Sequence, residues 1–137
     1  MSNIIEALTE TVRGRVITRS DSDYDAARAV HNGMHDRRPR AVIRCVDSAD
    51  AMAVVAAGRD AGLDVAIRGG GHSVPGLGTV EDGLVIDLSK MKNVWVDPIK
   101  KVARVGAARR GVTSTMRLTR SAWRRPAGSS RRPGLVA

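Results

Sequence analysis

The sequence is poor in aromatic side chains and in cysteine, and both shortages narrow what it can encode. Among its 137 residues there is no phenylalanine, and the aromatic residues are Tyr24, Trp95 and Trp123. A core must therefore be built from aliphatic side chains. Cys45 is the sole cysteine, which excludes an intrachain disulfide framework. A lone thiol within an apolar run is expected to be buried.

Long apolar runs are also absent. No stretch approaches the roughly 20 apolar residues that a membrane-spanning helix needs. Residues 1–12 contain Glu6 and Glu10 in place of the apolar core of a signal peptide. We therefore expect a cytoplasmic protein with no membrane partner. No metal site is predicted, because the chain has no cysteine pair and the sequence offers no partner to His31 or His35.

Acidic residues are missing from the C-terminal end of the chain. All 14 acidic residues and 15 of the 23 basic ones fall in residues 1–108, which gives this part a net charge of +1. The other eight basic residues are arginines of residues 109–137, and they supply most of the overall charge of +9. Neither a helical nor a strand period persists there, which predicts a basic, disordered tail over residues 108–137.

Residues 1–107 show the periodicities of an α+β domain. Helices are expected over residues 4–12, 24–32 and 49–61, and strands over residues 16–17, 41–46, 65–67, 84–88, 94–96 and 101–105. The first long strand, the helix after it and the next strand form a β-α-β unit with parallel strands. The third helix places Met52, Val55 and Ala56 on one face. A strand-rich part follows and ends in a hairpin.

The glycine-rich loop at residues 69–78 is the part that indicates chemistry. Three consecutive glycines at 69–71 leave the backbone bare, so that its N–H groups can converge on an anion. Arg68 adds a charge and Ser73 a hydroxyl donor, and a pyrophosphate suits such a cradle. The loop lacks the Gly-Lys-Ser/Thr of a Walker A loop and leads into a strand, unlike a Rossmann fingerprint. The simplest alternative is a flexible glycine turn.

Motif, spacing and element order together resemble one family. Residues 10–107 resemble the FAD-binding domain of berberine-bridge-enzyme-like FAD-linked oxidases, in the wider vanillyl-alcohol-oxidase and p-cresol-methylhydroxylase group. The matching stretches include Val42-Ile43-Arg44-Cys45, Ile67-Arg68-Gly69-Gly70-Gly71-His72-Ser73, Gly76 and Leu84-Val85-Ile86-Asp87-Leu88-Ser89. The resemblance implies that residues 1–107 are the N-terminal part of a p-cresol-methylhydroxylase-type FAD-binding domain.

The resemblance also implies a set of residues around the cofactor FAD. The pyrophosphate would be held by Arg68, Gly69, Gly70, Gly71, His72, Ser73 and Gly76. His72 would attach covalently to the flavin methyl carbon at position 8, whereas Cys45 does not match the family's second, cysteinyl link. Asp87 is expected to be structural.

The same resemblance implies an activity for a longer parent chain. The family oxidises alcohols, sugars or carbon–nitrogen centres by hydride transfer to the flavin and then passes electrons to oxygen. Its substrate domain and catalytic base lie further along the chain, so no catalytic residue is assigned here. A small-molecule substrate is expected only for the full-length parent.

Residues 108–137 differ from the family's sequence, which continues at this point with a segment such as Trp-Gly-Asp-Val-Asp-His-Ala-Thr. Codons chosen for that segment, read one nucleotide late, give Gly-Val-Thr-Ser-Thr-Met-Arg, the sequence of residues 111–117. Codons chosen for the later family sequence, read the same way, can give residues 118–137 and then a stop. We therefore expect a frameshift between about Gly106 and Gly111, and a truncated FAD-binding fragment that is inactive alone.

Two other functions stay open from the sequence. The arginine-rich tail could bind the phosphates of a nucleic acid, but it holds one aromatic residue, Trp123, and no recognisable module. The second alternative is a flavin-free binding module with the same fold. Retention of flavin by the protein would separate the FAD-binding fragment from both alternatives.

Overall fold

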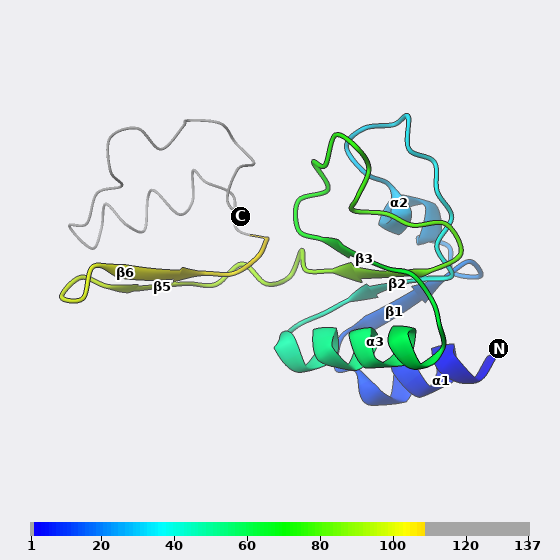
Figure 1. The fold of residues 1–137 in the computed structure, drawn as a ribbon, viewed down its shortest axis with the longest axis horizontal. Helices are drawn as coiled ribbons and strands as arrows, with labels where there is room; N and C mark the ends of the chain where they lie inside the picture. Colours follow the sequence, from blue (N-terminus) through cyan, green and yellow to red (C-terminus); the bar gives the residue numbers. More distant parts are fainter. Residues whose placement is uncertain (1, 109–137) are drawn as a thin grey trace.

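The computed structural model describes residues 2–108, which form one mixed sheet with three helices and a separate hairpin (Figure 1). The elements are α1 (Ser2–Thr11), β1 (Arg15–Thr18), α2 (Tyr24–Arg28), β2 (Ala41–Arg44), α3 (Ser48–Asp60), β3 (Val65–Arg68), β4 (Leu84–Asp87), β5 (Val94–Asp97) and β6 (Val102–Val105). The predicted α+β class is confirmed, and each expected strand is present in this order.

The central strands of the sheet, β2 and β4, are buried on both faces. Helices α1 and α3 cover one face, and α2 lies on the other with the long loops (Figure 1). Along β2, Ala41 and Ile43 belong to the core under α1 and α3, whereas Val42 belongs to the core under α2. Strands with two buried faces read as unbroken apolar runs. This explains why residues 41–46 and 84–88 are recognisable from the sequence.

The strands of the sheet follow the order β1-β2-β4-β3. The expected β-α-β unit is present, but β4, the last of the four sheet strands along the chain, lies between β2 and β3 and is parallel to both. Strand β1 is antiparallel to β2. Arg44 and Arg68 are both in register with Asp87, so the carboxyl ends of the three parallel strands meet at one place. The glycine-rich loop starts there.

The face of helix α3 that packs on the core is not the face that the sequence periodicity predicts. Met52 and Val55 are 71% and 47% exposed, whereas Val54 and Asp50 are buried. Residues 51–58 of this helix contain no polar side chain, so periodicity alone could not choose its buried face. Met52 and Val55 border an open apolar groove of about 450 Å³ beside Ile67 of β3.

Asp50 is buried because it satisfies the turn that leads into β1. Its carboxylate accepts hydrogen bonds from the backbone N–H groups of Arg13 at 2.8 Å, Gly14 at 3.0 Å and Val46 at 3.0 Å. Burial alone would raise the pKa of Asp50, but these three donors outweigh it and lower that pKa. An inward carboxylate therefore ties α3 to the N-terminal segment.

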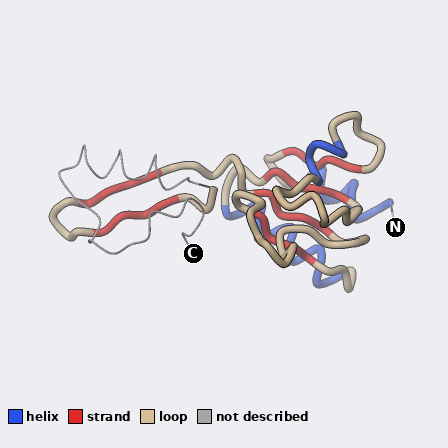
Figure 2. Tube along the Cα trace, turned by 90° about the horizontal axis from the view of Figure 1, so that it is seen from above, coloured by secondary structure: helices blue, strands red, loops and turns tan. Residues whose placement is uncertain are grey.

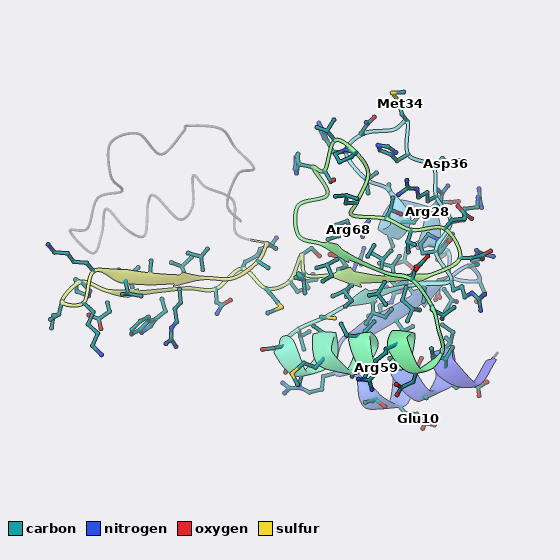
Figure 3. The ribbon with its side chains drawn as sticks, viewed as in Figure 1. Glu10, Arg28, Met34, Asp36, Arg59 and Arg68 are labelled. Atoms are coloured by element: carbon teal, nitrogen blue, oxygen red, sulfur yellow. The ribbon has the colours of Figure 1, made fainter. Side chains whose placement is uncertain are left out.

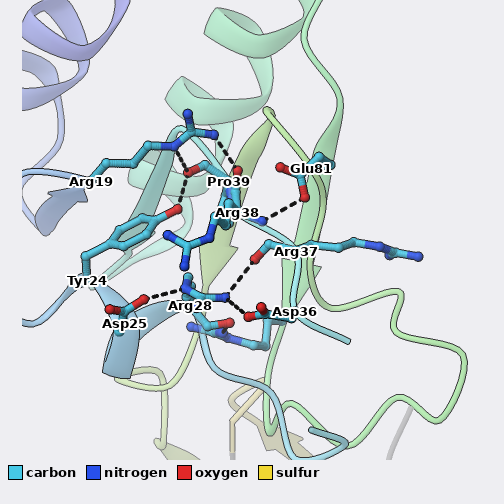
Figure 4. Close-up of polar contacts among 10 residues, drawn as sticks. Arg19, Tyr24, Asp25, Arg28, Asp36, Arg37, Arg38, Pro39 and Glu81 are labelled. Atoms are coloured by element: carbon cyan, nitrogen blue, oxygen red, sulfur yellow. Dashed lines mark hydrogen bonds and ion pairs between the residues drawn. The ribbon is translucent and has the colours of Figure 1, made fainter. Parts of the chain in front are cut away.

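Helix α2 ends at Arg28, earlier than the expected residue 32, because Ala29 already has an extended backbone (φ −58°, ψ 136°). Polar contacts hold the segment that follows (Figure 4). Arg28 pairs with Asp25 and Asp36, which raises the pKa of Arg28 and lowers that of Asp36. The buried hydroxyl of Tyr24 donates to the Pro39 carbonyl at 2.6 Å.

The β5–β6 hairpin projects away from the layered body (Figures 1 and 2). Its strands pair antiparallel, with Val94 opposite Val105 and Asp97 opposite Val102. The expected hairpin is therefore confirmed. Within residues 2–108, no helix is long and apolar enough to cross a membrane.

Candidate functional site

The glycine-rich loop joins the carboxyl end of β3 to β4 and lies on the same side of the sheet as α2 (Figure 1). A row of unpaired backbone donors marks its first half. Among residues 2–108, no hydrogen-bond acceptor meets any of the N–H groups from Gly69 to Val74. Residues 69–74 are exposed or half-buried, so water or a ligand can meet these donors. The donors are therefore accessible to an anion.

Glycine is required at several points of the loop for steric reasons. Gly71 and Gly76 have φ angles of +72° and +76°, in the left-handed region that other residues rarely adopt. A Cβ at Gly69 would lie 2.8 Å from the Ala107 carbonyl oxygen, and one at Gly76 would lie 2.7 Å from the His35 ring. The bare backbone therefore serves both the shape of the loop and its packing.

The side chain of Arg68 faces the protein interior. Only 7% of the residue is exposed, and its guanidinium donates to Asp87 Oδ2 at 3.1 Å. The same guanidinium donates to the carbonyls of Ala27, Arg28 and Ala29 at the end of α2 (Figure 3 labels Arg68 and Arg28). Asp87 is structural, as expected. Arg68 fixes the base of the loop, and its predicted contact with a pyrophosphate is not tested by this arrangement.

His72 and Ser73 directly follow the three glycines, in the middle of the loop. The His72 side chain is exposed, and its ring stacks on His31 with 4.7 Å between ring centroids. The Ser73 hydroxyl oxygen accepts from the Leu77 N–H at 3.1 Å, and the Ser73 carbonyl accepts from the Gly76 N–H. Its hydroxyl hydrogen is left to donate elsewhere. The structure thus brings together all the predicted site residues from Arg68 to Gly76.

The segment after α2 supplies supporting residues that the sequence did not indicate. The sequence offered no partner for a metal site at His31 or His35, and the structure places both residues against the glycine-rich loop. The His31 N–H donates to the Gly71 carbonyl at 3.0 Å, and His35 Nε2 lies 2.8 Å from the Val74 carbonyl oxygen. Arg37 donates to the carbonyls of Gly76 and Thr79. These contacts span about 40 residues of sequence, so no local signal could have revealed them.

The charge and polarity of the loop fit an anionic group. No acidic residue lies between Asp64 and Glu81, and the Oγ1 atom of buried Thr79 has no hydrogen-bond partner among the described residues. The same part of the chain contains no group of three or more histidine, cysteine, aspartate or glutamate residues suited to a metal ion. Bare glycines, free N–H groups and an adjacent hydroxyl fit a pyrophosphate.

Comparison with known proteins agrees with this chemistry. Residues 39–133 match the family described as "FAD binding domain". The chain belongs to this family. The match begins at the connector before β2, takes in the whole glycine-rich loop, and continues past residue 107. The FAD-binding-domain prediction and the predicted cofactor, FAD, are confirmed at the level of the family.

The relatives of this FAD-binding domain are FAD-linked oxidases. The chain is 34% identical over 96 residues to (R)-6-hydroxynicotine oxidase of Paenarthrobacter nicotinovorans, covering 70% of this chain and 21% of the relative. An FAD-linked oxidoreductase of Bacillus subtilis is 38% identical over 94 residues, with 69% and 21% covered. The chain therefore spans about a fifth of the length of these relatives.

Solved structures show the same fold. The structure of 6-hydroxy-D-nicotine oxidase from Arthrobacter nicotinovorans superposes with a TM-score of 0.76 at 30% identity, covering 80% of this chain and 24% of that one. A berberine-bridge-enzyme-like protein of Physcomitrella patens gives a TM-score of 0.78 at 26% identity, covering 86% and 26%. The predicted p-cresol-methylhydroxylase-type fold is confirmed.

Several predictions stay untested by the structure and the relatives. They are the individual cofactor contacts of residues 68–76, the covalent link through His72, the cytoplasmic location and the small-molecule substrate of the parent chain. The boundary at residue 107 and the out-of-frame, disordered tail are also untested, since residues 109–137 lie outside the described part. Cys45 is a separate case: it is buried, and burial raises the pKa of its thiol to about 11. That thiol is suited to packing rather than to a flavin link.

Proposed function

We propose that the N–H groups of residues 69–74 bind the pyrophosphate of FAD, and that the chain is the cofactor-binding part of an FAD-linked oxidase. The row of unpaired donors is the observation that carries this proposal. Each donor can form a charge-assisted hydrogen bond to a phosphate oxygen, and such bonds are about twice as strong as neutral ones. The parent enzyme would oxidise a small organic substrate by hydride transfer to flavin, and its electrons would pass to oxygen.

We also propose that His72 forms a covalent link to the flavin. The bond would join one imidazole nitrogen to the methyl carbon at position 8, with loss of one hydrogen from each partner. The two electrons and two protons released would pass to dioxygen and give hydrogen peroxide. The exposed His72 ring has no hydrogen-bond partner among residues 2–108, so its nitrogens are free for this reaction.

A pair of glycine variants tests the pyrophosphate site. Gly71→Ala and Gly62→Ala both place a Cβ at a positive φ, +72° and +64°, and neither Cβ meets a close clash. Both should cost roughly 1 kcal/mol of stability. Only Gly71→Ala distorts the donor row, so it should weaken FAD binding while Gly62→Ala should not.

Titration of each variant with FAD, ADP and inorganic pyrophosphate, followed by calorimetry, gives the readout. A parallel loss of affinity for all three ligands in Gly71→Ala supports the pyrophosphate contact. Equal affinities in Gly71→Ala and Gly62→Ala would overturn it. Salt-sensitive DNA binding without any FAD binding would favour the nucleic-acid alternative instead.

A further inference from the structure

Two histidine rings from distant parts of the chain stack beside the glycine-rich loop. The ring centroids of His31 and His72 lie 4.7 Å apart, and the ring planes are 28° from parallel. The backbone N–H of His31 donates to the carbonyl of Gly71, the neighbour of His72. His31 therefore contacts the middle of the loop, at Gly71 and His72, through both its backbone and its ring.

The stack is the main restraint on the orientation of His72. Within residues 2–108, neither ring nitrogen of His72 has a hydrogen-bond partner. An exposed side chain without such a partner exchanges among staggered rotamers on fast timescales. Gly70 is also close, since a Cβ there would lie 2.9 Å from His72 Nδ1. The imidazole is therefore packed against both the His31 ring and the bare backbone of Gly70.

The position of His31 is itself fixed by the buried core. The Arg68 guanidinium bridges Asp87 on β4 to the carbonyls of Ala27 and Ala29 at the end of α2. His31 follows Ala29 by two residues, so it leaves α2 from a point tied to the carboxyl end of the sheet. A rigid base of this kind is what a well-placed reacting group requires.

We propose that His31 is a positioning residue for His72, and that its ring holds the His72 imidazole in the orientation needed to bond to the flavin methyl carbon. This inference rests on the proposed function, because it supposes that His72 makes the covalent link. Loss of the ring should slow attachment without abolishing FAD binding, since the pyrophosphate donors of residues 69–74 are unchanged. An aromatic ring of similar size at position 31 should restore the rate.

The stack can be tested first without any cofactor. The full chain has three histidines, so the imidazole signals in its NMR spectrum can be assigned with single variants. In His31→Ala the ring protons of His72 should shift as the neighbouring ring is lost. In His31→Phe they should stay close to a stacked position. Met34→Ala is the matched control, because Met34 lies on the same connector and is exposed (Figure 3). Unshifted His72 signals in His31→Ala would overturn the proposal.

The rate of flavin attachment is the second test. The 137-residue chain and each of its variants are incubated with FAD. Samples are denatured in acid at successive times, and the flavin fluorescence that stays on the protein is measured. Misplacing a reacting group costs about ten- to a hundredfold in rate. We therefore expect that fall in His31→Ala, recovery in His31→Phe, and the wild-type rate in Met34→Ala.

The outcomes separate the two proposals. A wild-type rate in His31→Ala, with the His72 signals shifted, overturns the positioning role and leaves the covalent link standing. A slow His31→Phe variant overturns ring stacking as the cause. A wild-type chain that binds FAD but never retains it after denaturation overturns the covalent link itself, and the positioning role with it.

Discussion

The layered body and the β5–β6 hairpin use the same kind of element in opposite ways. Strands β2 and β4 are buried on both faces, whereas the hairpin strands are largely open to solvent. Trp95 is 52% exposed and Ile99 is 91% exposed. An isolated two-stranded hairpin is marginally stable at best. Stability therefore resides in the body, and single substitutions should show it.

The largest contrast is expected between two arginines. Arg68→Ala leaves buried Asp87 with the more distant Arg44, at 3.7 Å, as its ion-pair partner among the described residues, and breaking a buried pair costs about 3–5 kcal/mol. Arg104→Ala removes an arginine placed over the Trp95 ring on the exposed hairpin, which is worth about 0.5–1 kcal/mol. Urea unfolding of both variants gives the comparison, and equal losses would contradict the assignment of stability to the body.

The second largest effect is expected in how the free energy of unfolding depends on pH. The pKa of Asp50 is lower in the folded chain than in the unfolded one, so its contribution to stability is complete above the unfolded value of about 3.9. It is lost as pH falls through the folded pKa. Asp50→Asn should cost about 1–3 kcal/mol near neutral pH, because one backbone donor loses its acceptor.

The same variant should also flatten the acid side of the stability curve, measured by unfolding from neutral pH to about pH 2. Asp97→Asn on the hairpin is the matched control, since within residues 2–108 Asp97 accepts from just two exposed backbone N–H groups, both of its own turn. Parallel acid curves for the wild type and Asp50→Asn would show that Asp50 does not carry this effect.

A third contrast concerns thiol reactivity. Cys45 is buried and its pKa is raised to about 11, so alkylation should wait for global unfolding. A Cys45→Ala/Val102→Cys double variant places the thiol on the exposed hairpin, where alkylation should be fast. Labelling rates followed by mass spectrometry test this, and rapid labelling of native Cys45 would show that the body opens locally.

The smallest effect is expected for Trp95→Ala. The ring is half exposed and lies outside both core clusters, so the main loss is its contact with Arg104, and the free energy of unfolding should fall by only about 0.5–1 kcal/mol. Amide exchange in β5 and β6 should nevertheless quicken. A loss as large as that of Arg68→Ala would mean that the hairpin is part of the cooperative unit.

Sequence reasoning succeeded where the signal is local. The strands at residues 41–46 and 84–88, the hairpin and the glycine-rich loop all carry their own patterns. The early end of α2, the inward face of α3 and the contacts of His31 and His35 with the loop could not be predicted, because long-range contacts decide them. The insertion of β4 between β2 and β3 is also invisible in the order of elements along the chain.

The origin of residues 109–137 remains a prediction about DNA. Resequencing across the codons for residues 104–137 should find a single-base change that restores Trp-Gly-Asp-Val in an open frame. The family match that continues to residue 133 makes this check worthwhile. If resequencing confirms the present reading frame, and neither alternative frame encodes a sequence like that of the family, the arginine-rich segment is the true coding sequence.

The place of β4 in the sheet has a consequence for the order of folding. Strand β4 can enter only between β2 and β3, and its entry closes the loop that began at Gly69. Pairings between strands that are distant in the chain form late, because loop closure must precede them. We therefore expect the anion-binding part of the loop, residues 69–74, to be among the last features to form. A nucleotide that binds there would recognise only chains whose sheet is already complete.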